Sequence, residues 1–136
     1  MALVDSRRQR ILAFCALYFA QGIPWGFMLL TLPSYLADHY SLGDNEIGNL
    51  KAVILIPWSF KLIWAPLIDT MTIRSMGRRR CWIIGAQVMM AVTLIGILMV
   101  PDVTSDFRLL GIMFFIHNIF ASLQDVSTDA LAVDIL

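Results

Sequence analysis

Residues 81–100 read CWIIGAQVMMAVTLIGILMV, twenty residues without one charged side chain. A helix rises about 1.5 Å per residue, so a stretch of this length crosses the roughly 30 Å hydrocarbon core of a bilayer. Lipid admits only helices and closed barrels, because no water is there to bond the backbone, and barrel strands are short and alternate in polarity. The stretch therefore predicts a membrane-spanning helix.

Three more apolar stretches of spanning length lie outward from this one, at about residues 11–32, 47–69 and 109–136. Hydrophobic residues make up 59% of the 136-residue chain and the mean hydropathy is +0.76, whereas soluble domains are about 45–50% apolar. We therefore predict an all-α integral membrane protein, with residues 1–10 preceding a membrane domain over residues 11–136. A cleaved signal peptide fits less well, because the first apolar stretch is long and three others follow.

The formal net charge is zero, so the chain lacks the basic field of nucleic-acid-binding proteins. Its two cysteines, Cys15 and Cys81, do not have the spacing of a disulfide or zinc framework. We therefore expect no nucleic acid, metal or cofactor as a partner, and we expect the lipid bilayer as one.

Arginines gather on one side of the predicted membrane. Seven precede the first span or lie between the second and third: Arg7, Arg8, Arg10, Arg74, Arg78, Arg79 and Arg80. The connection between the third and fourth spans has only Arg108, and the one between the first and second has neither Lys nor Arg. Since cytoplasmic loops are rich in Lys and Arg, the N-terminus is predicted to lie in the cytoplasm. Which membrane holds the protein is not indicated.

Lys61 lies among apolar residues inside the second span, eight residues before Asp69 at its cytoplasmic end. That separation corresponds to about 12 Å along a helix, too far for the ammonium to reach water easily. A lysine near mid-membrane costs about 2.5–3.5 kcal/mol and usually faces the protein interior or a wet cavity. Two interpretations stay open, a structural ion pair and a contact with a solute.

The fourth span carries a polar face along an otherwise apolar helix. A rotation of about 100° per residue places five residues on this face and two at its edge. They are Asn118, Ser122, Asp125, Thr128 and Asp129, with His117 and Gln124 at the edge. By the helical rise Asp125 has about the same depth as Lys61, so the two can meet. The stripe indicates a hydrated path for a solute or proton, or a polar partner helix.

The sequence QGIPWG, residues 21–26, interrupts the first span. Pro24 removes a backbone donor and kinks a helix. The bend is either a packing kink or the wall of a cavity. Our candidates for the solute or proton path are Gln21, Trp25, Lys61, Gln124, Asp125 and Asp129.

Asp69 ends the second span, and GRRR, residues 77–80, opens the third. Asp69 can pair across the short loop with Arg78 or Arg79. Such a clamp would hold one conformational state and release in another. The arginines also fit a role as positive-inside anchors, and the two roles are compatible.

These pieces resemble the major facilitator superfamily. GRRR after an aspartate at the end of the second helix is similar to its signature between helices 2 and 3, although Gly77 follows Asp69 by eight residues rather than about three. One branch of the superfamily is more similar: the AmpG-like muropeptide permeases and the acetyl-coenzyme A transporters. The chain resembles this branch in its longer loop, in FKLIWAPLID before that loop, in QDVSTDA of the fourth helix, and in FAQGIPWG and TLPSYL of the first. Ala132 stands where the permeases tend to carry arginine, which favours the acetyl-coenzyme A transporters.

The resemblance implies a twelve-helix secondary transporter in two halves, built of three-helix inverted repeats and working by alternating access. Four of the expected twelve helices are present, so we expect a fragment whose partners are the missing C-terminal helices and a small solute. That solute is expected to be anionic or amphiphilic, such as acetyl-coenzyme A or a muropeptide. The proton-driven permease relatives imply a protonatable role for Asp125 or Asp129.

Two alternatives stay open. Folate and pterin transporters also carry a DxxxDA pattern in helix 4, and a non-transporting four-helix membrane adaptor would use the polar face as a partner interface. We do not expect an enzyme, because the sequence has no evident Ser-His-Asp or Cys-His arrangement and no dense acidic cluster for a magnesium–phosphate site.

Overall fold

The computed structural model describes residues 6–71, 77, 79–100, 102 and 106–135 of the chain. Within these ranges the chain is helical and no strand is present. Four helices are long and apolar enough to cross a membrane: Arg7–Tyr40, Asp44–Thr70, Arg80–Leu98 and Phe107–Ile135. The prediction of an all-α integral membrane protein with four spanning helices is confirmed.

The first span has three segments: α2 (Arg7–Gly26), the π-helical turn η1 (Phe27–Thr31) and α3 (Leu32–Tyr40). Pro24 lies inside α2, and the wider π-turn follows within a turn of the missing donor. The helix continues beyond the predicted limit at residue 32, and Pro33 stands in the first turn of α3. Ser41, with a φ of 52°, ends it in the left-handed conformation.

The second span is also broken in the middle, into α4 (Asp44–Leu55), the 3-10 turn η2 (Ile56–Phe60) and α5 (Lys61–Thr70). Pro57 lies in the first turn of η2. A 3-10 turn is wound more tightly than an α-helix, so it changes the direction of the side chains that follow. Lys61 is the first residue after this turn.

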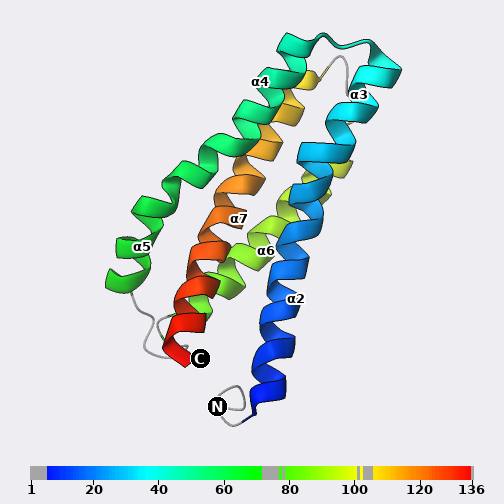
Figure 1. Cartoon of the computed structure of the whole chain (residues 1–136). Helices are drawn as coiled ribbons and strands as arrows, with labels where there is room; N and C mark the ends of the chain where they lie inside the picture. The colour runs from blue at the N-terminus through cyan, green and yellow to red at the C-terminus, as the bar shows by residue number, and fades with distance from the viewer. Residues whose placement is uncertain (1–5, 72–76, 78, 101, 103–105, 136) are drawn as a thin grey trace.

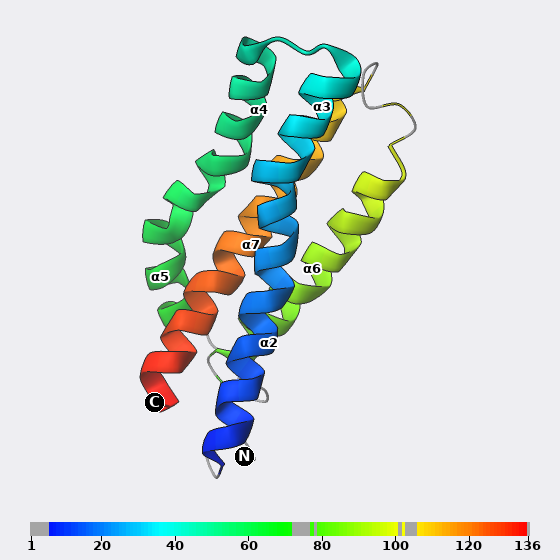
Figure 2. The same cartoon turned by 45° about the vertical axis from the view of Figure 1, so that its right-hand side comes forward.

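The third and fourth spans are α6 (Arg80–Leu98) and α7 (Phe107–Ile135). Helix α7 lies at the centre, between α2 on one side and α4 and α5 on the other, with α6 packed along it (Figures 1 and 2). In its most apolar stretch of 18 residues, 50% of the residues are buried, against 11–22% in the corresponding stretches of the other three spans. Helix α7 is therefore the element that every other span contacts.

Helix α2 begins and α7 ends at the same end of the bundle (Figure 1). There the Arg10 guanidinium donates a hydrogen bond to the Ile135 carbonyl. We call this the terminal end. Apolar side chains fill the opposite half, in a cluster of Met28, Leu32, Leu36, Leu50, Ile54, Leu110 and Phe114. A smaller cluster of Ile68, Ala86 and Leu123 lies toward the terminal end. The polar residues of α7 occupy the space between and beside these clusters.

Candidate functional site

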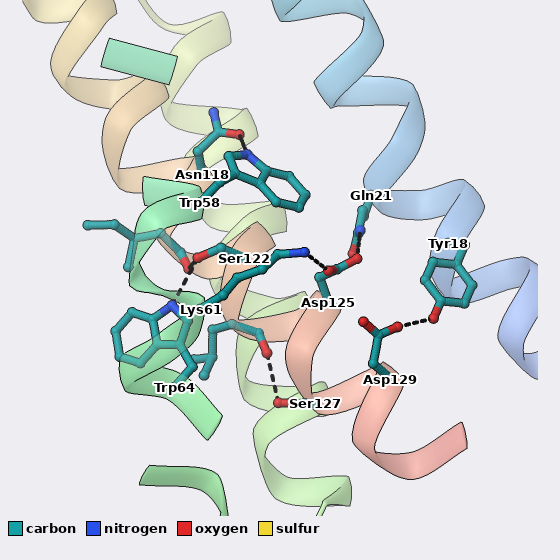
Figure 3. A network of polar contacts seen from close by, with 12 residues as sticks. Tyr18, Gln21, Trp58, Lys61, Trp64, Asn118, Ser122, Asp125, Ser127 and Asp129 are labelled. Atoms are coloured by element: carbon teal, nitrogen blue, oxygen red, sulfur yellow. Dashed lines mark hydrogen bonds and ion pairs between the residues drawn. The ribbon is translucent and has the colours of Figure 1, made fainter. Parts of the chain in front are cut away.

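An ion pair joins the second and fourth spans inside the bundle. The Lys61 ammonium donates to one carboxylate oxygen of Asp125, and the Gln21 amide of α2 donates to the other (Figure 3). The Asp125 side chain is 10% exposed and that of Lys61 is 39% exposed. Three of the predicted path residues thus meet, and the structure forms the contact between Lys61 and Asp125 that the helical rise allows.

The position of the Lys61 ammonium follows from the 3-10 turn in the second span. Lys61 follows the 3-10 turn directly, and its Nζ lies 4.6 Å from the centre of the Trp58 ring. A cation above an indole face is stabilised by the negative charge density of the ring. The lysine is therefore held by a carboxylate on α7 and by an aromatic ring of its own span.

Two indole N–H groups extend this contact along α7. Trp58 donates to the Asn118 amide oxygen at 3.4 Å, and Trp64 donates to the Ser122 hydroxyl at 2.9 Å (Figure 3). Sequence reasoning identified the polar face of α7 but not these donors. A tryptophan in an apolar run carries no signal for its hydrogen-bond partner, because that partner depends on the rotamer and on the rotation of the helix.

Asp129 lies one turn beyond Asp125 and accepts a hydrogen bond from the Tyr18 hydroxyl of α2 (Figure 3). Asp129 is exposed, and Tyr18 is 40% exposed. An exposed carboxylate within a membrane span is costly against acyl chains, so such groups face protein or water. This side of α2 and α7 is therefore a surface that needs a polar covering.

The other two path candidates occupy different positions. Trp25 is 37% exposed and its ring meets Trp58 edge to face, with 5.8 Å between ring centres. Gln124 is fully buried and donates to the Leu17 carbonyl of α2 at 3.1 Å. Gln124 therefore ties α2 to α7.

A second charged cluster lies at the terminal end. Arg79 contacts Asp69 through Nη1 at 2.6 Å and Asp134 of α7 through Nε at 3.1 Å. Burial lowers the pKa of Arg79, but the hydrogen bonds to Asp134 and Asp69 outweigh it, so the pKa is raised. Arg78, the other predicted clamp residue, lies outside the described residues. Asp134 was not among the predicted clamp residues, because it is distant in sequence and ends a helix without a motif around it.

His117 is buried between α6 and α7, where its Nδ1 lies 2.9 Å from the Thr93 hydroxyl. This agrees with a histidine that packs and bonds inside the bundle. In the part of the chain that the structure describes, no group of three or more His, Cys, Asp or Glu side chains is arranged to hold a metal ion.

Comparisons with known proteins find a matching family model and several curated relatives. The family model described as "Acetyl-coenzyme A transporter 1" matches residues 10–136. An uncharacterized protein of Haemophilus influenzae is 32% identical over 98% of this chain and 30% of its own length. The anhydromuropeptide permease of Escherichia coli is 26% identical over 87% of this chain and 23% of its own length. An uncharacterized protein of Schizosaccharomyces pombe is 31% identical over 68% of this chain and 17% of its own length.

The chain thus spans less than a third of the length of the curated relatives that it matches. No solved structure matches it significantly.

Proposed function

The chain belongs to the acetyl-coenzyme A transporter 1 family, and on this premise we propose that it works within a secondary-active membrane transporter for a small anionic or amphiphilic solute. Acetyl-coenzyme A is the first candidate solute, because of the family, and a muropeptide is the second, because of the permease relative. The observation that carries the proposal is the pair of Lys61 and Asp125, with Gln21, inside a membrane bundle.

The pair supplies a way to recognise negative charge. Lys61 is 39% exposed, so a phosphate or carboxylate of the solute can approach its ammonium from the open side. Two anions then compete for one cation. When Lys61 turns to the solute, Asp125 is left almost buried beside Gln21 alone, and the carboxylate becomes neutral by taking up a proton. Solute binding and proton uptake would be coupled through one side chain.

Alternating access requires contacts that form in one state and break in another. The contacts of Tyr18 with Asp129, and of Arg79 with Asp69 and Asp134, close the terminal end by tying α2 and the start of α6 to α7. We propose that opening at this end separates these groups, and that the end faces the cytoplasm. The exposed polar side of α2 and α7 would then face the central cavity, opposite the further helices that the twelve-helix architecture supplies.

Uptake into proteoliposomes that contain the product of the complete gene tests the proposal. Radiolabelled acetyl-coenzyme A, anhydro-muropeptide and a pterin are offered in parallel, with and without an inward proton gradient. We expect saturable uptake of acetyl-coenzyme A that the gradient stimulates and that Lys61→Met reduces at least tenfold. Folded protein that takes up none of the three would refute transport and favour an adaptor. Preference for the muropeptide or the pterin would refute acetyl-coenzyme A as the solute.

A further inference from the structure

Five side chains form a closed circuit of contacts around the ion pair. Gln21 bonds to Asp125, Asp125 pairs with Lys61, the Lys61 ammonium lies over the Trp58 ring, and Trp58 meets Trp25 edge to face. The circuit closes because Trp25 and Gln21 are one turn apart on α2. It crosses the first, second and fourth spans, and its aromatic part joins α2 to η2 beside α7.

The aromatic part of the circuit is accessible. Trp25 is 37% exposed, Trp58 is half-buried and the Lys61 side chain is 39% exposed. Within the described part of the chain, the Trp25 indole N–H has no hydrogen-bond partner. The edge-to-face contact, with ring centres 5.8 Å apart, itself covers only one of the ring faces of the pair. The site therefore offers an indole face, a free N–H donor and a cation side by side.

We propose that Trp25 and Trp58 form a stacking subsite for the planar ring of an adenine nucleotide, with Lys61 binding its phosphate. The inference rests on the proposed function and adds to it the part of the solute that the chain recognises. A purine stacked on an indole gains roughly tenfold or more in affinity, and every purine has the π-face that this needs. A muropeptide consists of sugars and a short peptide, and so presents no purine ring beside an anion.

The subsite also has a consequence for the ion pair. A ring inserted against Trp58 occupies the face on which the ammonium lies, and the attached phosphate attracts the same ammonium. Both effects draw Lys61 away from Asp125. Recognition of the nucleotide would thus be transmitted to the carboxylate by the side chain that links them.

The test compares three solutes on the product of the complete gene in proteoliposomes. Acetyl-coenzyme A and its 3′-dephospho form both carry adenine, whereas S-acetyl-phosphopantetheine keeps the thioester and one phosphate but lacks the ring. The measured quantity is the kcat/KM ratio for uptake of ring-bearing over ringless solute. Trp25→Leu removes the π-face, Trp25→Phe retains one, and Trp82→Leu on α6, outside the circuit, is the matched control.

We expect the wild-type ratio to be roughly tenfold or more for both ring-bearing solutes. Trp25→Leu should abolish this preference, Trp25→Phe should retain most of it, and Trp82→Leu should leave the ratio unchanged. Uptake of all three solutes at equal efficiency, or a preference that survives Trp25→Leu, would overturn the subsite while leaving transport intact. A protein that takes up none of these three solutes would overturn acetyl-coenzyme A as the solute, and the parallel assay with anhydro-muropeptide and pterin then decides whether transport itself is refuted.

Discussion

Removal of one charge at a time from the central ion pair should have unequal effects. Lys61→Met leaves a carboxylate that is 10% exposed and has only Gln21 as a donor, whereas Asp125→Asn leaves an ammonium that is 39% exposed. An unpaired buried charge is much more costly than an unpaired charge that can reach water. Lys61→Met is therefore expected to be the more destabilising of the two substitutions.

The magnitudes follow from the two exposures. Breaking a fully buried pair costs about 3–5 kcal/mol, and breaking an exposed one about 0–1 kcal/mol. Because Gln21 still bonds to the stranded carboxylate, we expect Lys61→Met to cost about 2–3 kcal/mol and Asp125→Asn about 1 kcal/mol. The double variant has no buried charge, so it should cost about 1 kcal/mol and reveal a coupling of about 2 kcal/mol.

The assay is a double-mutant cycle on the free energy of unfolding, measured by SDS titration in mixed micelles and followed by circular dichroism. The reasoning is wrong if the single effects add within about 0.5 kcal/mol. It is equally wrong if Asp125→Asn proves the more costly variant.

Three further outcomes are expected. In proteoliposomes, Asp125→Asn should slow uptake and flatten its dependence on external pH, because asparagine cannot exchange a proton; a wild-type pH profile would remove this residue from the proton path. Arg79→Lys should slow transport severalfold although the charge is retained, because the guanidinium contacts two carboxylates at once and a single ammonium does not reproduce that geometry. An unchanged rate would argue against the clamp. Thr93→Val should cost about 1–3 kcal/mol of unfolding free energy, because buried His117 loses its hydroxyl partner, and His117→Leu in the same chain, which leaves no unpaired polar group, should restore part of it.

The spanning helices could be predicted from the sequence because the bilayer imposes a length and forbids exposed backbone. The same rise per residue brought Lys61 and Asp125 to one depth before any contact was known, since depth depends only on counting from the helix ends. The direction in which the two side chains point around their helix axes could not be predicted in the same way. It depends on the π-turn η1, which follows Pro24, and on the 3-10 turn η2, which contains Pro57. The sequence does not dictate the length of either turn.

The contacts that sequence reasoning missed are those that depend on this rotation. Tyr18 and Asp129 are 111 residues apart, and the two indole bonds to α7 span about 60 residues. Each partner was visible as a polar group in an apolar stretch, yet several others were equally plausible partners. Gln124 was predicted as a path residue from its place at the edge of the polar face, and its bond to the backbone of α2 could not be predicted from the sequence.

Three carboxylates on the last three turns of α7 hold the bundle together at different points. Asp125 binds α2 and α5, Asp129 binds α2, and Asp134 binds Arg79 at the start of α6. In a bilayer, apolar helices gain little by burying apolar surface against one another, so such polar contacts specify which arrangement forms. A movement of α2 or α5 against α7 must then exchange the partner of a particular carboxylate. Among the three, Asp125 is bound by two spans at once, and one of its partners is the cation that we assign to the solute. A change at that single carboxylate therefore acts on contacts to both spans, whereas a change at either of the others acts on contacts to one.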